Sequence, residues 1–118
     1  MPQDKAAAVA DILIDGDLTG HTTHGLQLLP GYLREVESGA MCVEGEPTVI
    51  AETPAALTWD GRRLPGPWLV LQAMKAATEK ARRCGTGTVV IRRGHHIASL
   101  ASFHKRATDQ GLMMILAS

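Results

Sequence analysis

Two short histidine-bearing segments carry the side chains with the most versatile chemistry in this sequence. Residues 20–25 read Gly-His-Thr-Thr-His-Gly, so two imidazoles and two hydroxyls lie between glycines just before a predicted helix. Residues 92–99 read Arg-Arg-Gly-His-His-Ile-Ala-Ser and follow an apolar, strand-like run. Imidazole exchanges protons near neutral pH, so either segment could supply an acid, a base or hydrogen bonds to a polar ligand.

Each segment also has an explanation that needs no ligand. Residues 20–25 fit a helix start capped by Thr23, and composition alone favours this interpretation. The functional interpretation directs Thr23 and His24 at a ligand near a helix N-terminus. For residues 92–99 two interpretations are about equal. One is a basic surface loop, and the other is a pocket at the carboxyl end of a strand, where open α/β sheets bind ligands.

Other kinds of site are disfavoured. Gly85 and Gly87 lack the third glycine of a dinucleotide fingerprint, and they follow a predicted helix rather than a strand. The five histidines include no His-Glu-x-x-His, so a zinc site is a minor alternative and we expect no metal. Two cysteines are too few for a disulfide framework or a four-thiolate zinc site.

Length and composition narrow the class of protein. The 118 residues suffice for one small domain, and a hydrophobic content of 45% predicts a folded chain. Twelve Lys and Arg balance twelve Asp and Glu, which argues against an electrostatic nucleic-acid binder. No apolar run approaches membrane-spanning length and no signal peptide is visible, so we expect no membrane partner and a cytoplasmic location.

The apolar pattern predicts helices first and a sheet later. We expect a helix over residues 4–18, a second ending at Gly39, and a third that begins near Pro67 and ends at Gly85. Pro30 marks either the first turn of the second helix or a bend within it. Ser99 is a candidate N-cap for a fourth helix. Strands are expected at 48–51, 56–59, 88–91 and 112–116, with 88–91 buried.

A helix joining two adjacent apolar strands, as expected over residues 88–116, is a crossover unit, so we predict a mixed α/β fold. We treat residues 1–118 as a single domain with a helical N-terminal segment, 1–43, and the beginning of an α/β core, 44–118. Three or four short strands make only a small sheet, and the sequence ends on an apolar run. We therefore favour an incomplete domain.

Taken in order, these motifs resemble the malate/L-lactate dehydrogenase family, a non-Rossmann group that includes ureidoglycolate and sulfolactate dehydrogenases. The resemblance rests on matches spread along the whole chain: Gly-His-x-Thr-His-Gly at 20–25, Leu-Pro-x-Tyr at 29–32, Asp-Gly at 60–61, Pro-Gly at 65–66, Val-Ile-Arg at 90–92 and His-Ile at 96–97. It corresponds to about the first third of a family member.

The resemblance implies hydride transfer between NAD or NADP and a small α-hydroxy or α-keto acid, carried out by a homodimer. It implies that His96 is the catalytic proton donor and acceptor, and that Thr23, His24 and Tyr32 bind the substrate. The family's main cofactor-binding segments correspond to sequence beyond Ser118, so cofactor-binding residues stay unassigned.

One departure from the family pattern bears on the substrate. Many members carry an arginine three residues after the motif's last glycine, where this chain has Leu28. That arginine would bind a carboxylate bidentately, so its absence leaves the particular acid open. Candidate replacements are Arg34, Arg92 and Arg93.

A competing hypothesis is a non-catalytic α/β interaction module, or a degenerate fragment of the family, that docks a partner chain along an apolar edge. It accounts for the short length but leaves the two histidine segments unexplained.

Overall fold

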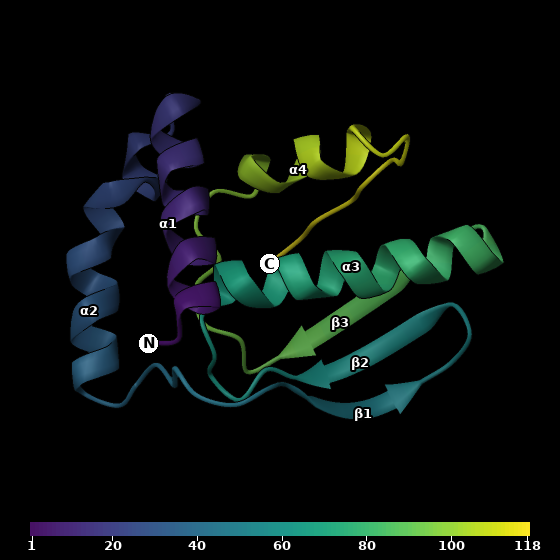
Figure 1. Cartoon of the computed structure of the whole chain (residues 1–118), viewed down its shortest axis with the longest axis horizontal. Helices are drawn as coiled ribbons and strands as arrows, with labels where there is room; N and C mark the ends of the chain where they lie inside the picture. Colours follow the sequence, from purple (N-terminus) through teal and green to yellow (C-terminus); the bar gives the residue numbers. More distant parts are fainter.

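The N-terminal segment is helical, as expected. In the computed structural model, which describes all 118 residues, α1 (Gln3–Leu18) buries Ile12 and Leu13 completely. Two short 3-10 turns, η1 (Thr22–His24) and η2 (Leu26–Leu28), lead into α2 (Leu29–Glu37), which lies beside α1 (Figure 1). Pro30 occupies the first turn of α2, where its missing N–H costs no hydrogen bond, so α2 begins at this point without a bend.

A three-stranded mixed sheet follows and confirms the predicted fold class. β1 (Thr48–Glu52) pairs antiparallel with β2 (Ala56–Asp60), and β2 pairs parallel with β3 (Thr88–Arg92). α3 (Gly66–Cys84) connects the two parallel strands and packs against them. The crossover unit is therefore β2–α3–β3, one unit earlier than expected. Because β2 and β3 are parallel, their carboxyl ends meet at one edge, with Asp60 opposite Arg92.

The expected strand at 112–116 is absent. Met113 and Ile115 are exposed while their neighbours are half-buried, so the run keeps the alternation of a strand. It has no hydrogen-bonded neighbour, because the sheet ends at β3 and contains no fourth strand. The expectation that 88–91 is buried is wrong for the same reason. β3 is an edge strand, and its central Val90 is 55% exposed.

Ser99 does not cap the fourth helix. α4 (Ala101–Thr108) begins after Leu100 without a side-chain cap. The buried Ser99 hydroxyl instead lies 3.2 Å from Nδ1 of His21. This contact joins the loop after β3 to η1, 78 residues earlier in the chain.

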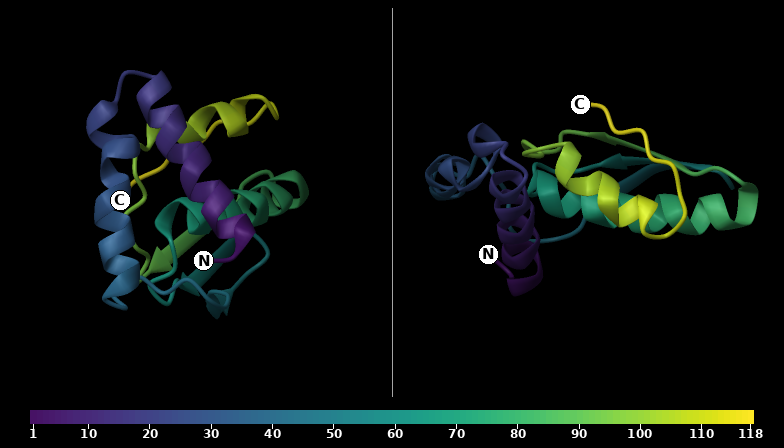
Figure 2. Two further views of the ribbon diagram at one scale, coloured as in Figure 1. Left: turned by 60° about the vertical axis from the view of Figure 1, so that its left-hand side comes forward. Right: turned by 90° about the horizontal axis from the view of Figure 1, so that it is seen from above.

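The main core is formed by residues of the N-terminal helices, α3 and α4 and of the loops next to them. Figure 2 shows how these helices lie in two further views. The fully or nearly buried members of the core are mainly aliphatic: Val9, Ile12, Leu13, Tyr32, Met41, Val70, Ala98 and Phe103. None of the helices is long and apolar enough to span a membrane.

Candidate active site

The loop after β3 is fixed against the start of α3. The backbone N–H of His95 donates to the Leu64 carbonyl at 3.3 Å. Gly66, the first residue of α3, lies so close that a Cβ there would collide with the carbonyl groups of His95 and His96. The absence of a side chain at Gly66 therefore lets the histidine loop sit where it does.

One edge of the His96 ring is held by the protein. Its Nδ1 lies 2.8 Å from the Tyr32 hydroxyl and accepts the Ala98 N–H at 3.3 Å. The same hydroxyl lies 3.2 Å from the His96 carbonyl oxygen. Tyr32 comes from α2 and is 6% exposed, so these contacts are anchored in the core. The other ring nitrogen of His96, Nε2, has no hydrogen-bond partner in the chain.

The motif at 20–25 meets the face of this ring. The His24 ring stacks on that of His96, with centroids 5.9 Å apart, and the Thr23 hydroxyl lies 2.9 Å from Nδ1 of His24. The motif is held in place by Asp17, whose carboxylate accepts the Leu26 N–H at 3.0 Å. Thr23 does not cap a helix through its side chain.

All four residues expected from the sequence thus lie in one cluster, although they come from three separate segments. His96 and Tyr32 are in direct contact, His24 stacks on His96, and Thr23 joins through His24. We call this group, with its flanking side chains His21 and His95, the histidine cluster.

The flanking side chains were given no role by sequence reasoning. The His21 ring lies 5.5 Å from that of His24. His95 meets Tyr32 edge-on at 5.8 Å, its Nε2 lies 3.6 Å from a Glu35 carboxylate oxygen, and its buried Nδ1 has no partner. Their place in the two histidine motifs was a signal for both. No sequence pattern pointed to Glu35.

Burial and neighbouring imidazoles set the protonation of the cluster. Partial burial lowers the pKa of His96 below its usual 6.5, and the neighbouring His24 and His95 lower it further. His96 is therefore mainly neutral at pH 7. Burial raises the pKa of Tyr32 to about 12, against a smaller lowering by a backbone hydrogen bond, so its phenol stays protonated.

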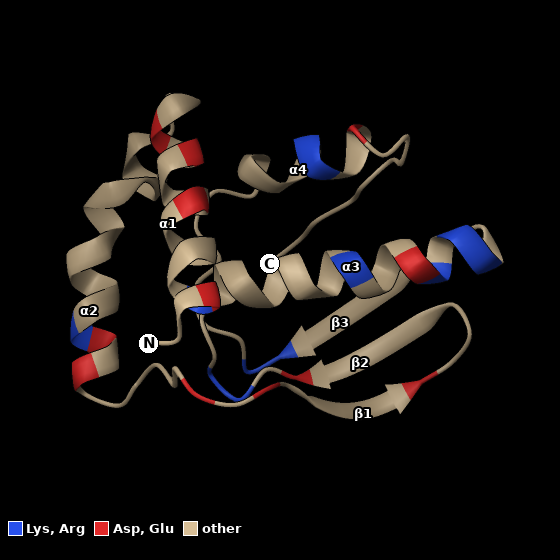
Figure 3. Cartoon of the chain, in the orientation of Figure 1, with Lys and Arg blue, Asp and Glu red and all other residues tan.

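Two of the three candidate replacements for the missing arginine are engaged elsewhere. Arg93 donates to both carboxylate oxygens of Asp60 at 2.6 to 3.0 Å, and Arg92 lies 3.3 Å from one of them. The Arg93 hydrogen bond, with the Arg62 N–H next, lowers the Asp60 pKa to about 2. Figure 3 shows the two charge signs meeting where β2 and β3 end. Arg34, exposed on α2, makes no ion pair.

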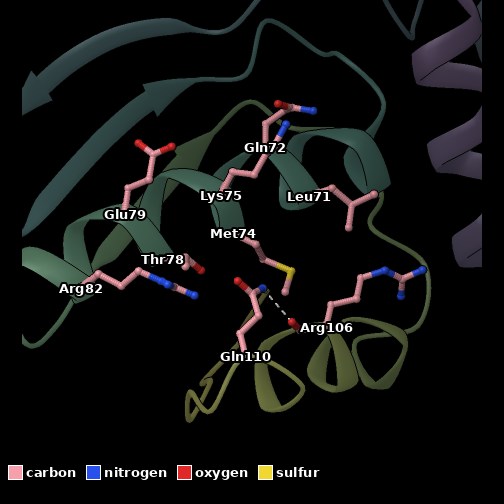
Figure 4. Close-up of a pocket in the computed structure, with 9 residues that line it drawn as sticks. All are labelled: Leu71, Gln72, Met74, Lys75, Thr78, Glu79, Arg82, Arg106 and Gln110. Carbon is pink, nitrogen blue, oxygen red and sulfur yellow. Dashed lines mark hydrogen bonds between the residues drawn. The ribbon is translucent and has the colours of Figure 1, made fainter.

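Two hollows in the structure are lined mainly by other kinds of side chain. One of about 500 Å³ lies between α3 and α4 (Figure 4). Its most prominent groups are cations, of which Arg106 pairs with Asp15 at 2.8 Å, and it contains no histidine. A larger groove of about 890 Å³ begins near His95 and runs along α3 under residues 112–116, with a mostly apolar lining. No group of three or more His, Cys, Asp or Glu residues could hold a metal ion.

The glycines around α3 have structural roles within the chain. Gly85 ends α3 in the left-handed conformation, with φ +82°. A Cβ at Gly87 would collide with the Ala77 carbonyl, so this glycine lets β3 begin close to α3. Gly61 faces the Leu69 side chain, and Gly66 faces the histidine loop. We assign none of these glycines to a cofactor.

A mixed sheet, N-terminal helices and a cluster of histidines at the loop after a strand together define a non-Rossmann α/β chain with a candidate site at the histidine cluster. The profile of the malate/L-lactate dehydrogenase family matches residues 1–118, and the chain belongs to this family. This confirms the resemblance seen in the sequence.

The similarity extends to individual relatives. Hydroxycarboxylate dehydrogenase B of Escherichia coli (strain K12) is 31% identical over 113 residues, which are 96% of this chain and 31% of that protein. Malate dehydrogenase of Pyrococcus abyssi is 34% identical over 114 residues, 97% of this chain and 32% of the relative. The structure of malate dehydrogenase from Pyrococcus horikoshii OT3 superposes with a TM-score of 0.91 at 32% identity, over 94% of this chain and 32% of the other. This chain therefore spans about a third of their length.

Proposed function

We propose that residues 1–118 form the proton-transfer part of an oxidoreductase that interconverts a small α-hydroxy acid and its α-keto acid with NAD or NADP. The observation that carries the proposal is the arrangement around His96. One ring nitrogen is held by the protein, and the other is free beside a second imidazole and a hydroxyl. Membership of a hydroxy-acid dehydrogenase family supports the reaction class.

His96 is the proposed catalytic acid and base. In the oxidation, the substrate hydroxyl gives its proton to Nε2 of His96, while the hydrogen on the substrate carbon leaves as hydride. The nicotinamide cofactor, when bound, supplies the acceptor for that hydride. In the reverse direction the imidazolium returns the proton to the developing alkoxide oxygen. The lowered pKa of His96 suits the oxidation, since the neutral base predominates at pH 7.

Thr23, His24 and Tyr32 are the proposed substrate-binding residues. The Thr23 hydroxyl and the His24 ring can both hydrogen-bond to substrate oxygens, and the buried Tyr32 ring supports the wall behind His96. Arg34 is the remaining candidate for contact with the substrate carboxylate, because Arg92 and Arg93 are bound to Asp60.

The partner we propose is a second copy of the chain. Three leucines spaced three and four residues apart, Leu26, Leu29 and Leu33, are 38–53% exposed and continue from η2 onto α2. Such an apolar stripe beside the site would be covered in a homodimer. Light scattering after size exclusion measures the mass directly. A monomer at all concentrations would contradict this proposal.

A non-catalytic docking module is the second candidate. Met113 and Ile115 are 90% and 86% exposed, and the free edge of β3 offers unpaired backbone groups. On this hypothesis His96→Gln would leave the binding of a partner chain unchanged, and no α-keto acid would bind the histidine cluster.

The test combines turnover with binding. NADH or NADPH oxidation is followed with a panel of α-keto acids, and turnover is expected to fall by about 10²–10⁴ in His96→Gln. His104→Gln, on α4 and outside the cluster, is the matched control and is expected to keep full activity. In parallel, titration with an α-keto acid is expected to move the NMR ring signals of His24 and His96 but not those of His104. Turnover unchanged in His96→Gln, or ring signals that do not move, would overturn the proposal.

A further inference from the structure

The Tyr32 hydroxyl lies within hydrogen-bond distance of two groups of the same residue. It is 2.8 Å from Nδ1 of His96 and 3.2 Å from the His96 carbonyl oxygen. It can therefore donate to either one by rotating about its C–O bond. When it donates to the carbonyl, its oxygen is free to accept a proton from Nδ1. No other acceptor for an Nδ1 proton is within hydrogen-bond distance.

The second contact of Nδ1 fixes the resting state of the ring. The Ala98 N–H can only donate, and it points at Nδ1 at 3.3 Å. Nδ1 must therefore be unprotonated in the resting neutral ring, and the proton is on Nε2. This tautomer can donate to a keto oxygen, but it cannot accept a proton from a substrate hydroxyl at Nε2.

We propose that Tyr32 is a positioning residue that supports both neutral tautomers of His96, by donating its hydroxyl to Nδ1 in one and turning it to the His96 carbonyl in the other. His96 is exposed, so the tautomers exchange through solvent: Nε2 releases its proton to water, and water returns one proton to Nδ1. This inference rests on the proposed function and changes the role of the Tyr32 hydroxyl from substrate contact to support of the base. In the turned state Nδ1–H donates to the Tyr32 oxygen, the long 3.3 Å contact from the Ala98 N–H is given up, and the Nε2 lone pair faces the substrate. After the substrate proton reaches Nε2, the imidazolium keeps the same Nδ1–H contact.

The surroundings of Tyr32 fit a hydroxyl that rotates and never ionises. Its ring is buried and wedged against both His95 and His96, with centroids 5.8 and 6.0 Å away. Burial holds its pKa near 12, so the phenol proton stays on the oxygen in both states. No proton is gained or lost by Tyr32, and the only net transfer is from the substrate to His96.

Several other titratable groups lie around His96 and must be kept constant in any test. His24 faces the ring from η1, and His21 lies behind His24. His95 precedes it in the loop and approaches Glu35 of α2. Tyr32→Phe leaves all of these unchanged and removes only the hydroxyl, so it isolates the proposed contact.

The test reads the His96 ring directly by ¹⁵N NMR of the histidine-labelled chain, without substrate or cofactor. Above about pH 8, where an ordinary histidine is neutral, wild-type His96 is expected to show the Nε2–H tautomer with Nδ1 as acceptor. In Tyr32→Phe the imidazolium loses its acceptor. The variant loses the Tyr32 hydrogen bond in both charge states of the ring. The bond of the imidazolium is charge-assisted and stronger than that of the neutral ring, so the His96 titration midpoint is expected to fall by roughly 0.5–1 pH unit. His104 is the internal control and is expected not to shift.

Two results would overturn the inference whether or not the chain is active. One is a wild-type His96 that rests as the Nδ1–H tautomer, a measurement that needs no variant. The other is a folded Tyr32→Phe chain whose His96 midpoint equals that of the wild type. Where turnover is measurable, the variant is expected to lose about tenfold in kcat with little change in KM. A rise in KM alone would return Tyr32 to direct substrate binding.

Discussion

Two polar clusters follow the same strand, and they differ in how completely their charges are matched. Where β3 ends, Arg92 and Arg93 both form ion pairs with the buried Asp60 at the end of β2. Each charged group there has a partner of opposite charge. Three residues later the histidine cluster begins, with several imidazoles and one carboxylate, from Glu35, at its border. Its key nitrogen, Nε2 of His96, has no partner.

The two clusters differ in whether their polar groups can exchange a proton near pH 7. A matched pair lowers the Asp60 pKa to about 2 and keeps it ionised, which stabilises the turn but leaves no proton to exchange. Burial lowers the pKa of His96, and the neighbouring His24 and His95 lower it further, so the ring is mainly neutral near pH 7. A perturbed pKa of this kind is typical of sites that exchange protons.

The largest expected effect on stability comes from the residue that fixes the position of the histidine loop. In Gly66→Ala the new Cβ collides with the His95 and His96 carbonyls, so the loop must move. We expect a loss of about 1–3 kcal/mol in the free energy of unfolding, and displaced His96 ring signals. Urea unfolding and NMR measure the two effects.

Gly94→Ala is the matched control, because a Cβ there meets Leu69 and Ile91 at ordinary distances of 3.5 and 3.7 Å. It is expected to change stability by less than about 0.5 kcal/mol. Equal effects of the two substitutions would mean that close packing at Gly66 does not position the loop.

The matched cluster is tested by its acid dependence. The folded pKa of Asp60, about 2, is below its usual 3.8, so its stabilising contribution is present above about pH 4 and is lost as pH falls toward 2. Asp60→Asn is expected to be less stable than the wild type at pH 7, with the difference shrinking between pH 4 and pH 2. Urea midpoints at pH 7, 4 and 2.5 measure this. A difference independent of pH would show that the charge of Asp60 does not stabilise the turn.

The smallest effect is expected within the histidine cluster itself. His24→Gln removes a like-charged neighbour, so the His96 pKa is expected to rise by a few tenths of a unit. In a catalytic assay, oxidation is expected to be flat above pH 7 and to fall through a midpoint below about 6.5, which His24→Gln moves upward. His95 and Glu35 stay unchanged in this comparison. A downward shift would show that His24 acts on His96 mainly by hydrogen bonding.

The local chemistry of the sequence predicted much of this molecule. The periodicity of apolar residues located α1, α3 and all three observed strands, and Pro30 marked the start of α2. The two histidine motifs contain Thr23, His24 and His96, the family resemblance added Tyr32, and the four residues lie together. Residues 112–116 show the limit of such patterns. Their alternation is a property of the run alone, whereas a strand also needs a neighbour, and none is present.

Residue type and spacing determined the elements and the candidate acid–base groups, because propensity, turn chemistry and imidazole pKa are local properties. Tertiary structure decided which partner each group has. Ser99 contacts His21 instead of capping α4, Arg92 and Arg93 bind Asp60, and the Tyr32 hydroxyl meets both Nδ1 and the carbonyl of His96. These contacts join residues 32 to 78 positions apart, and only the folded chain sets their distances.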